Sequence, residues 1–398
     1  MIKRPQYINT LLAMKDKDFI KVLTGVRRCG KSTILQAFVE ELIRQGISSD
    51  QVQVYNFEDL DNAYLQDYQA LHKQISDKLV AGKMNYVFLD EIQMVDQFEK
   101  ALNSLFLKDN LDLYITGSNA YMLSGELATL LSGRYVEIKV LPLSFAEYSS
   151  RVPQPALATV FQEYLDRGGF PYAIQIDDDR THKSYIDGIV NTVFVKDILS
   201  RKKQSDAALV EQLARFLTDT SGSRISVKKI ADSLTSSGQK TTSPTISEYL
   251  KAFSEAYLFY RCDRFDVFGK KYLSTNAKYY PVDQSLRRAL LGRKRPDFGH
   301  RLEGIVYLEL IRRGYQVYVA DAGDLEIDFV AQKEGVRDYF QVAYSVVDKK
   351  TYQREVAPFF QIKDNYRKIL LTMDEGSYND QGIEQINIVD WLLETSFP

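Results

Sequence analysis

The sequence is poor in cysteine and has no long apolar segment, and both shortages limit the kind of protein it can encode. The only cysteines, Cys29 and Cys262, form no CxxC pair, which argues against a disulfide framework or a zinc ribbon. No stretch approaches the roughly 20 apolar residues that cross a bilayer, and charges interrupt the apolar runs near the N-terminus. The sequence therefore predicts a cytoplasmic protein without a membrane partner.

A strong excess of one charge is also missing, because the formal net charge is only -2. No whole-chain field would attract nucleic acid, so such a partner must be met by a local patch. The 398 residues are 45% apolar and 26% charged, which is typical of a soluble globular chain of two or three domains.

The first 150 residues alternate apolar runs with helical patterns, which is typical of a parallel α/β sheet. A helix is expected at 33–45. Strands are expected at 19–24, 51–57, 85–90, 111–116 and 135–140. Residues 1–150 are therefore expected to form a parallel α/β domain, whose chemistry depends on the loops at the strand ends.

Four further segments follow this domain. Residues 151–204 are expected to form a helical linker or lid that contains a GGFP element. Residues 205–266 show three helical patterns and a short ribbon, which match a winged-helix-like domain. A basic connector is expected at 267–298, and a second α/β unit at 299–398.

The segment GVRRCGKS fits the pattern G-x-x-x-x-G-K-[ST] and lies between an expected strand and an expected helix. Gly25 and Gly30 would turn the backbone so that its N–H groups face phosphate. Lys31 would reach the β- and γ-phosphates, and Ser32 would offer a hydroxyl to Mg²⁺. The expected nucleotide-binding residues are Gly25, Val26, Arg27, Arg28, Cys29, Gly30, Lys31, Ser32 and Thr33.

The apolar run YVFLDEIQ ends in two acids and has the form of a Walker B segment. Asp90 would hold the Mg²⁺ shell, and Glu91 would polarise the attacking water. The alternative is that both acids only end a strand and cap the next helix.

Two later positions are candidates for sensing the γ-phosphate. The run TGSNA places Ser118 or Asn119 after a strand, as a sensor or as a simple turn. The run LSGRY places Arg134 before another strand. Arg134 would be an arginine finger or sensor, in cis or from a neighbouring subunit, or a solvated charge.

Together these residues resemble the bacterial and archaeal AAA-type ATPases that pair a P-loop module with a C-terminal domain of unknown function. The matching segments are GVRRCGKS, FLDEIQ, TGSNA, GRY and LPLSFAEY, which together span most of residues 1–150. The GGFP run at 168–171 resembles the GxP element of such ATPases. The resemblance implies that Pro171 approaches the nucleotide.

The resemblance also implies that the C-terminal domain has the PD-(D/E)xK fold of restriction endonucleases. Glu303 and Asp328 match the first two acids of that fold, whereas Gln341 and Ala343 replace the third carboxylate and the lysine. Phosphodiester cleavage needs carboxylates that hold a metal and a cation near the attacking water. We therefore expect a binding or scaffold module without nuclease activity.

The expected function is hydrolysis of ATP to ADP and phosphate with Mg²⁺, coupled to movement of the downstream domains against a macromolecular partner. That partner could be DNA, or the protein could be a nucleotide-gated switch that binds another protein or a second copy of itself. Basic residues that could follow a DNA backbone, or form only a solvated face, are Lys228, Lys229, Arg261, Arg264, Lys270, Lys271, Arg287, Arg288, Arg293, Lys294 and Arg295.

Overall fold

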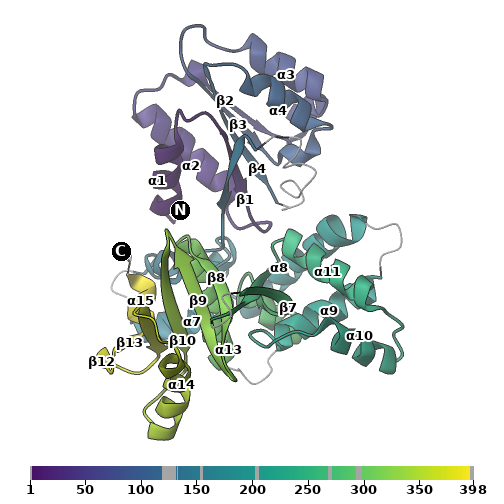
Figure 1. Ribbon diagram of the computed structural model, residues 1–398. Helices are drawn as coiled ribbons and strands as arrows, with labels where there is room; N and C mark the ends of the chain where they lie inside the picture. The colour runs from purple at the N-terminus through teal and green to yellow at the C-terminus, as the bar shows by residue number, and fades with distance from the viewer. Residues whose placement is uncertain are drawn as a thin grey trace. The chain divides into compact units, whose positions relative to one another are not determined.

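The computed structural model describes residues 2–118, 131, 133–152, 156–201, 206–267, 271–292 and 298–394. Contacts divide the chain into an N-terminal unit, residues 1–140 with 255–257, and a C-terminal unit, residues 141–254 with 258–398. Each unit contains its own β-sheet (Figure 1). Within the described ranges, no helix is long and apolar enough to cross a membrane.

The N-terminal unit contains a five-stranded sheet in the order β2-β3-β4-β1-β5. Its strands are β1 Ile20–Thr24, β2 Val52–Asn56, β3 Asn85–Asp90, β4 Leu111–Gly117 and β5 Tyr135–Lys139. Every neighbouring pair is parallel, so all five carboxyl ends lie at one edge. The predicted parallel sheet is therefore confirmed, with strand ends that differ by at most one residue.

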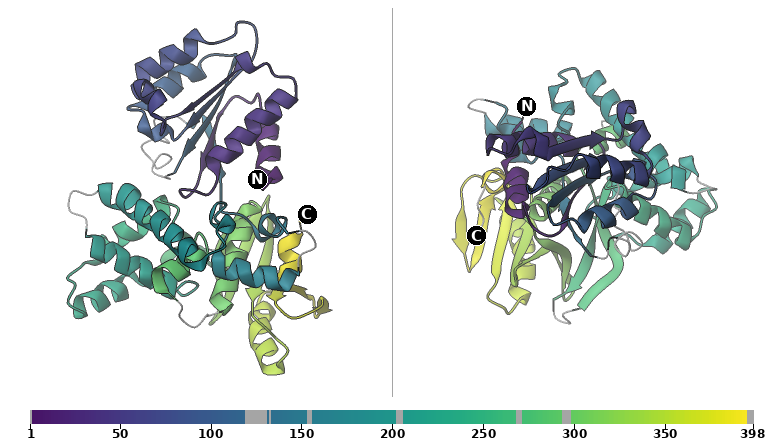
Figure 2. Two further views of the ribbon diagram at one scale, coloured as in Figure 1. Left: turned by 180° about the vertical axis from the view of Figure 1, so that it is seen from behind. Right: turned by 90° about the horizontal axis from the view of Figure 1, so that it is seen from above.

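Helices cover both faces of this sheet (Figure 2). They are α1 Pro5–Met14 and α2 Lys31–Arg44 on one face, and α3 Tyr68–Asp77 and α4 Phe98–Phe106 on the other. Phe88 of β3 contacts Phe38 of α2, with ring centroids 6.1 Å apart. Its strand neighbours Val87 and Leu89 belong to the apolar cluster that includes α3 and α4, as the alternation of a strand requires. Short turns η1 Ser49–Gln51, η2 Leu60–Leu65 and η3 Ile92–Met94 lie between these elements.

The C-terminal unit begins with a helical region. It contains α6 Phe145–Ser149, α7 Leu157–Arg167, η5 Ala173–Gln175, α8 Asp179–Thr192, η6 Val193–Ile198, η7 Leu199–Arg201, α9 Ala207–Asp219, α10 Val227–Ser236 and α11 Ser243–Glu255. An antiparallel hairpin of β6 Phe259–Asp266 and β7 Lys271–Pro281 follows α11. Three helices and a hairpin are the elements of a winged helix, but the winged-helix assignment itself stays a prediction.

The hairpin is part of an eight-stranded mixed sheet in the order β12-β13-β11-β10-β9-β8-β6-β7. The remaining strands are β8 Gln316–Ala322, β9 Leu325–Lys333, β10 Val336–Val342, β11 Arg367–Thr372, β12 Tyr378–Asp380 and β13 Ile383–Asn387. Helices α12 Ser285–Leu291, α13 Phe298–Arg312, α14 Lys349–Gln361 and α15 Ile388–Leu393 complete the unit. In the stretch expected as a connector, 267–298, most described residues thus belong to β7 and α12.

The core of the C-terminal unit forms on both faces of this sheet. Helix α14 contributes Phe359 to a cluster with Val330 and Tyr339. On the other face, Tyr307 of α13 lies 5.8 Å from the ring of Phe329. Trp391 of α15 contacts Phe340 there as well. This arrangement positions acidic side chains of α13 and β9 close together, while the nuclease-like classification stays a prediction.

Candidate functional site

The loop between β1 and α2 makes a turn that requires glycine at two positions. Gly25 has φ +150°, and a Cβ there would lie only 2.1 Å from the backbone oxygen of Val140. Gly30 has φ +102° and directly precedes the first residue of α2. A side chain at either position would strain the turn. The loop therefore ends at a helix N-terminus, which favours anions.

Lys31 directs its ammonium group into this loop. The Nζ donates to the backbone oxygens of Gly25 at 3.1 Å and Val26 at 3.4 Å. It also lies 3.7 Å from Glu91 Oε1, and the side chain is only 4% exposed. Ser32 and Thr33 are exposed on the first turn of α2. A buried cation beside exposed hydroxyl groups fits a ligand that is both anionic and metal-bound.

The two acids at the end of β3 are buried and held in place by one threonine. Thr116 Oγ1 donates to Asp90 Oδ1 at 2.6 Å and accepts a hydrogen bond from the N–H of Glu91 at 2.9 Å. Glu91 has φ +55° and ψ +48°, a left-handed conformation that a non-glycine residue rarely adopts. Such strain occurs preferentially at functional sites. Sequence reasoning missed Thr116, although it lies in the TGSNA run.

Gln93 connects Glu91 to the expected sensor. Its Nε2 donates to Glu91 Oε2 and lies 3.5 Å from the Oγ of Ser118, which is 1% exposed. Within the described part of the chain, Gln93 Oε1 is buried without a hydrogen-bond partner, so it is available as an acceptor. The structure thus brings Ser118 and Glu91 together, whereas Asn119 lies outside the described residues. Sequence reasoning missed Gln93 within FLDEIQ.

Arg134 lies at the opposite edge of the sheet from the P-loop. Strand β5 runs parallel to β1, with Tyr135 beside Ile20 and Lys139 beside Thr24. Arg134 precedes the start of β5, about 16 Å from the carboxyl edge at 3.3 Å per residue. Its guanidinium group lies 5.4 Å from the Phe106 ring. This geometry disfavours a cis contact with the nucleotide, and the role of Arg134 at the site, in cis or in trans, stays a prediction.

The other loop side chains have different surroundings. Arg27 Nη1 lies 3.9 Å from Glu58 Oε1, and Arg28 is exposed in a left-handed conformation. Cys29 is fully buried, and this burial raises the pKa of its thiol. The thiol therefore stays protonated at neutral pH and is unreactive.

The GGFP element belongs to the C-terminal unit, where Asp283 explains its glycines. Gly168 has φ +73°, and a Cβ there would lie 1.8 Å from Asp283 Oδ1. The N–H of Gly169 donates to Asp283 Oδ2 at 2.6 Å. Burial raises the pKa of Asp283 to about 6. Pro171 follows this anchored turn, and its approach to the nucleotide stays a prediction.

A buried lysine lies among acids in the C-terminal unit. Lys278 of β7 is 2.7 Å from Glu303 Oε1, 2.6 Å from Glu326 Oε1 and 3.9 Å from Asp328 Oδ1. Burial and the neighbouring Glu303 raise the pKa of Asp328 well above its ordinary value. Burial opposes the charge of Lys278, but the three carboxylates, Glu303 foremost, raise its pKa. The lysine is therefore a permanent internal counter-ion for the acids.

Gln341 is also connected to this acid group. Its Oε1 accepts from the N–H of Asp328 at 3.2 Å, and its Nε2 donates to Glu355 Oε2 at 3.1 Å. Lys278 of β7 and Glu355 of α14 thus supply a lysine and a carboxylate close to Asp328 and Gln341. Sequence reasoning missed both, because it considered only the strand that contains Gln341 and Ala343. Nevertheless, the described side chains include no group of three His, Cys, Asp or Glu that could hold a metal.

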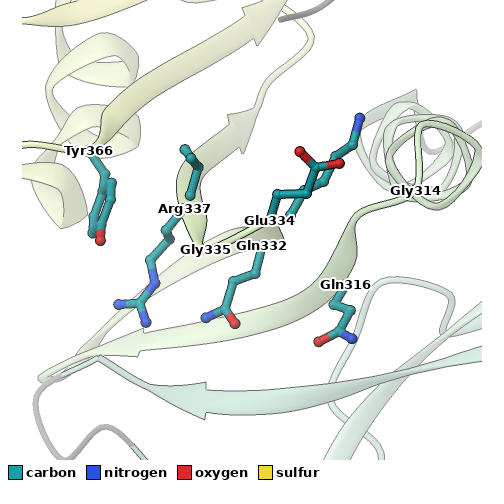
Figure 3. A pocket seen from close by; sticks show the side chains of 9 residues that line it. Gly314, Gln316, Gln332, Glu334, Gly335, Arg337 and Tyr366 are labelled. Carbon is teal, nitrogen blue, oxygen red and sulfur yellow. The ribbon is translucent and has the colours of Figure 1, made fainter.

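A hollow of about 460 Å³ lies beside the turn between β9 and β10. Arg337, Gln332 and Tyr366 line it (Figure 3). These groups offer hydrogen-bond donors and an aromatic edge but no pairing of nucleophile and base, so the hollow suits polar contact with a ligand more than catalysis.

Several arginines of the expected basic surface already form ion pairs within the C-terminal unit. These pairs are Arg261–Asp263, Arg264–Asp321 and Arg288–Asp179. Arg287 donates to the backbone oxygen of Thr218, whereas Lys228 and Lys229 are exposed. Lys270 and residues 293–295 lie outside the described residues, as does the side chain of Lys271. The positive charge of this surface is therefore partly neutralised.

The parallel sheet, P-loop and paired acids define a P-loop ATPase domain of the AAA type. Residues 17–149 match the family described as AAA domain, and residues 158–297 match a domain of unknown function (DUF8612). The fold is similar to the solved Walker-type ATPase of Pyrococcus abyssi, with a TM-score of 0.54 and 16% identity. That match covers 73% of this chain and 96% of the other.

Two relatives match almost the whole chain. An uncharacterised protein of Haemophilus influenzae is 41% identical over 403 residues, covering 99% of each chain. An uncharacterised protein of Methanocaldococcus jannaschii is 29% identical over 406 residues, covering 98% of this chain and 89% of the other. The chain therefore belongs to the same family as the Haemophilus influenzae protein.

Proposed function

We propose that this protein hydrolyses ATP to ADP and phosphate at the P-loop. The observation that carries the proposal is the position of Lys31 between the loop carbonyls and Glu91, 3.7 Å from Glu91 Oε1. Nucleotide phosphates would compete with Glu91 for this ammonium group. Glu91 would then be free to polarise a water, while Gln93 holds its other oxygen.

The residues near Lys31 also fit a magnesium ion. The Asp90 carboxylate and the exposed Ser32 hydroxyl are hard oxygen donors, which Mg²⁺ prefers alongside phosphate oxygens and water. When bound, Mg²⁺ would neutralise charge on the β- and γ-phosphates. Thr116 keeps Asp90 oriented through its 2.6 Å hydrogen bond. The buried Ser118 is proposed to sense the γ-phosphate and to report on it through Gln93.

Turnover of purified protein tests this proposal. Lys31→Ala should abolish nucleotide binding, because it removes the cation of the loop. Glu91→Gln should keep binding and slow hydrolysis at least a hundredfold, as expected for loss of a general base. Unchanged turnover in Glu91→Gln would show that another group activates the water.

The same site is proposed to control the C-terminal unit. Glu137 Oε1 of β5 accepts hydrogen bonds from Thr24 Oγ1 at 2.6 Å and from the Tyr257 hydroxyl at 2.9 Å. Thr24 directly precedes the P-loop, and Tyr257 belongs to the short segment 255–257 of the N-terminal unit. This segment continues the chain from α11 into β6, so a shift at the base of the P-loop has a covalent route to both elements.

DNA and protein are the competing partners for the C-terminal unit. The ion pairs of Arg261, Arg264 and Arg288 reduce the charge available for a DNA backbone, which supports the protein-binding alternative. Retention on duplex and single-stranded DNA at rising salt separates the two, because phosphate contacts weaken steeply with salt. Turnover with and without DNA, and mass in solution with ATP and with ADP, complete the test. Salt-sensitive retention with stimulated turnover would favour DNA.

We also propose that the C-terminal unit is not a nuclease. The ammonium of Lys278 lies in direct contact with Glu303 and Glu326, where it neutralises acids that a metal would need. The measurement is cleavage of DNA with Mg²⁺ or Mn²⁺ by the wild type and by Asp328→Ala. Metal-dependent cutting that Asp328→Ala abolishes would overturn the proposal.

A further inference from the structure

The N-terminal segment contributes a buried arginine to the P-loop. Arg4 is 8% exposed, and its Nη1 donates to the backbone oxygen of Cys29 at 3.1 Å. The two residues are 25 positions apart in the sequence, so a motif pattern does not reveal the contact. A buried, charge-assisted hydrogen bond of this kind is stronger than a neutral one.

The side chain of Arg4 is held in place before it reaches the loop. Its guanidinium group lies 4.5 Å from the centroid of the buried Tyr7 ring, in cation–π geometry. Its backbone oxygen accepts from the N–H of Tyr7 at 3.2 Å, at the start of α1. Helix α1 packs on α2, the helix that begins at Lys31. Arg4 therefore reaches the loop from a fixed support and not from a free tail.

The Cys29 carbonyl determines the direction of a neighbouring N–H group. The described chain contains no cis peptide bond, and in a planar trans peptide the C=O and the next N–H point in opposite directions. Because Arg4 binds the oxygen of Cys29, the N–H of Gly30 points away from Arg4. Gly30 precedes Lys31, so this N–H belongs to the donors that receive phosphate in a P-loop.

Charge supports the same conclusion. Burial raises the pKa of the Cys29 thiol, while the positive charges of Lys31 and Arg4 oppose that rise. Both cations are therefore close enough to act electrostatically on the centre of the loop. A second positive charge behind the loop would favour an anion in front of it.

We propose that Arg4 is a positioning residue of the nucleotide site. Arg4 holds the Cys29 carbonyl on its own side of the loop and thereby directs the Gly30 N–H toward the phosphates. The inference rests on the proposed nucleotide site and adds a residue outside its motif. Arg4 acts through the loop backbone and not on the reacting atoms. It should therefore affect the binding of ADP and ATP about equally.

Nucleotide affinity of the full chain, measured with a fluorescent ADP analogue and by competition with ATP, tests the proposal. Arg4→Ala should weaken both nucleotides at least tenfold, which corresponds to about 1.4 kcal/mol. The kcat at saturating ATP should stay within about threefold of the wild type, so the loss appears in KM. Arg4→Lys retains a charged donor and should recover most of the affinity. Lys3→Ala, which removes an exposed positive charge from the neighbouring residue, should bind like the wild type.

Melting curves show whether each variant is folded. If Arg4→Ala unfolds, Arg4→Met is measured in its place, because methionine keeps an apolar stem against Tyr7 and removes only the hydrogen-bond donors. The same tenfold loss of nucleotide affinity is expected. A folded variant that binds within threefold of the wild type, or that loses kcat with unchanged KM, overturns the role of Arg4. Absence of binding by the wild type, or normal binding by Lys31→Ala, would instead refute the nucleotide site itself.

Discussion

Replacing Lys278 by methionine should strongly destabilise the C-terminal unit. The substitution keeps a similar apolar stem and removes only the ammonium group. That group lies within 2.7 Å of both Glu303 and Glu326. The side chains of Lys278 and Glu303 are 3% and 7% exposed, so water cannot replace the lost counter-ion.

The expected magnitude follows from this burial. Removing one partner of a buried ion pair costs about 3 to 5 kcal/mol, because an uncompensated charge remains. For a domain of this size, each kcal/mol lowers Tm by roughly 2 to 4 °C, so the unit should melt roughly 6 to 20 °C earlier.

The loss should depend on pH in a defined direction. Burial already raises the pKa of Asp328 well above its ordinary value, and removal of the nearby ammonium should raise it further. The native variant then keeps a proton that the unfolded chain releases from about pH 4. Because the native wild type also keeps this proton above pH 4, the destabilisation of the variant relative to the wild type should grow only above the raised pKa of wild-type Asp328 and should be smallest in acid.

Thermal melting at pH 5 and pH 8 measures both effects. Lys228→Met is the matched control, because it makes the same substitution at an exposed lysine and should leave Tm nearly unchanged. If Lys278→Met melts like this control at pH 8, solvent screens the acid group and the argument from buried charge fails.

The remaining predictions concern other single positions. Gly168→Ala should destabilise the chain by about 2 kcal/mol or more, because its Cβ would overlap Asp283; an unchanged melting curve would contradict this. Burial raises the pKa of Asp283 to about 6, so stability should fall by about 3 kcal/mol between pH 4 and 6. Asp283→Asn should reduce this pH-dependent loss of stability when the free energy of unfolding is measured in urea. An unaltered dependence on pH would exclude Asp283 as its source. Gln93→Glu should lower kcat and move the acid limb of the pH–rate profile upward, because two touching carboxylates resist double ionisation; an unmoved limb would mean that Gln93 does not contact the base. If Arg134 acts in trans, Arg134→Ala should reduce turnover at the protein concentrations at which the specific activity of the wild type rises. Normal turnover of the variant at high protein concentration would exclude a role in trans.

The P-loop could be predicted from the sequence because its chemistry is local. Gly25, Gly30 and Lys31 lie in one short loop, and their spacing alone determines where the backbone donors and the ammonium lie. Asp90 and Glu91 follow from the same logic, since a parallel sheet aligns the ends of its strands. The alternation of apolar runs with helical patterns likewise predicted the five strands and their common direction.

The contacts that could not be predicted join distant segments. Arg4 meets Cys29, and Lys278 meets Glu326, through packing that no periodic pattern encodes. The position of Arg134 relative to the P-loop was hard to predict for a related reason. A motif position indicates that an arginine precedes a strand, but the edge of the sheet at which it lies depends on the direction of β5.

Two of the buried lysines, Lys31 and Lys278, show how one chain can use a lysine–carboxylate pair in two different ways. Lys31 lies 3.7 Å from Glu91 and otherwise binds neutral carbonyls, which a phosphate can displace because it offers a stronger charge-assisted bond. Lys278 instead contacts two carboxylates directly and is 3% exposed. An incoming anion would have to break both contacts and approach a group of acidic side chains. The first arrangement is suited to a switch and the second to a fixed support, so nucleotide-dependent change should begin at Lys31 and leave the acid group around Lys278 intact.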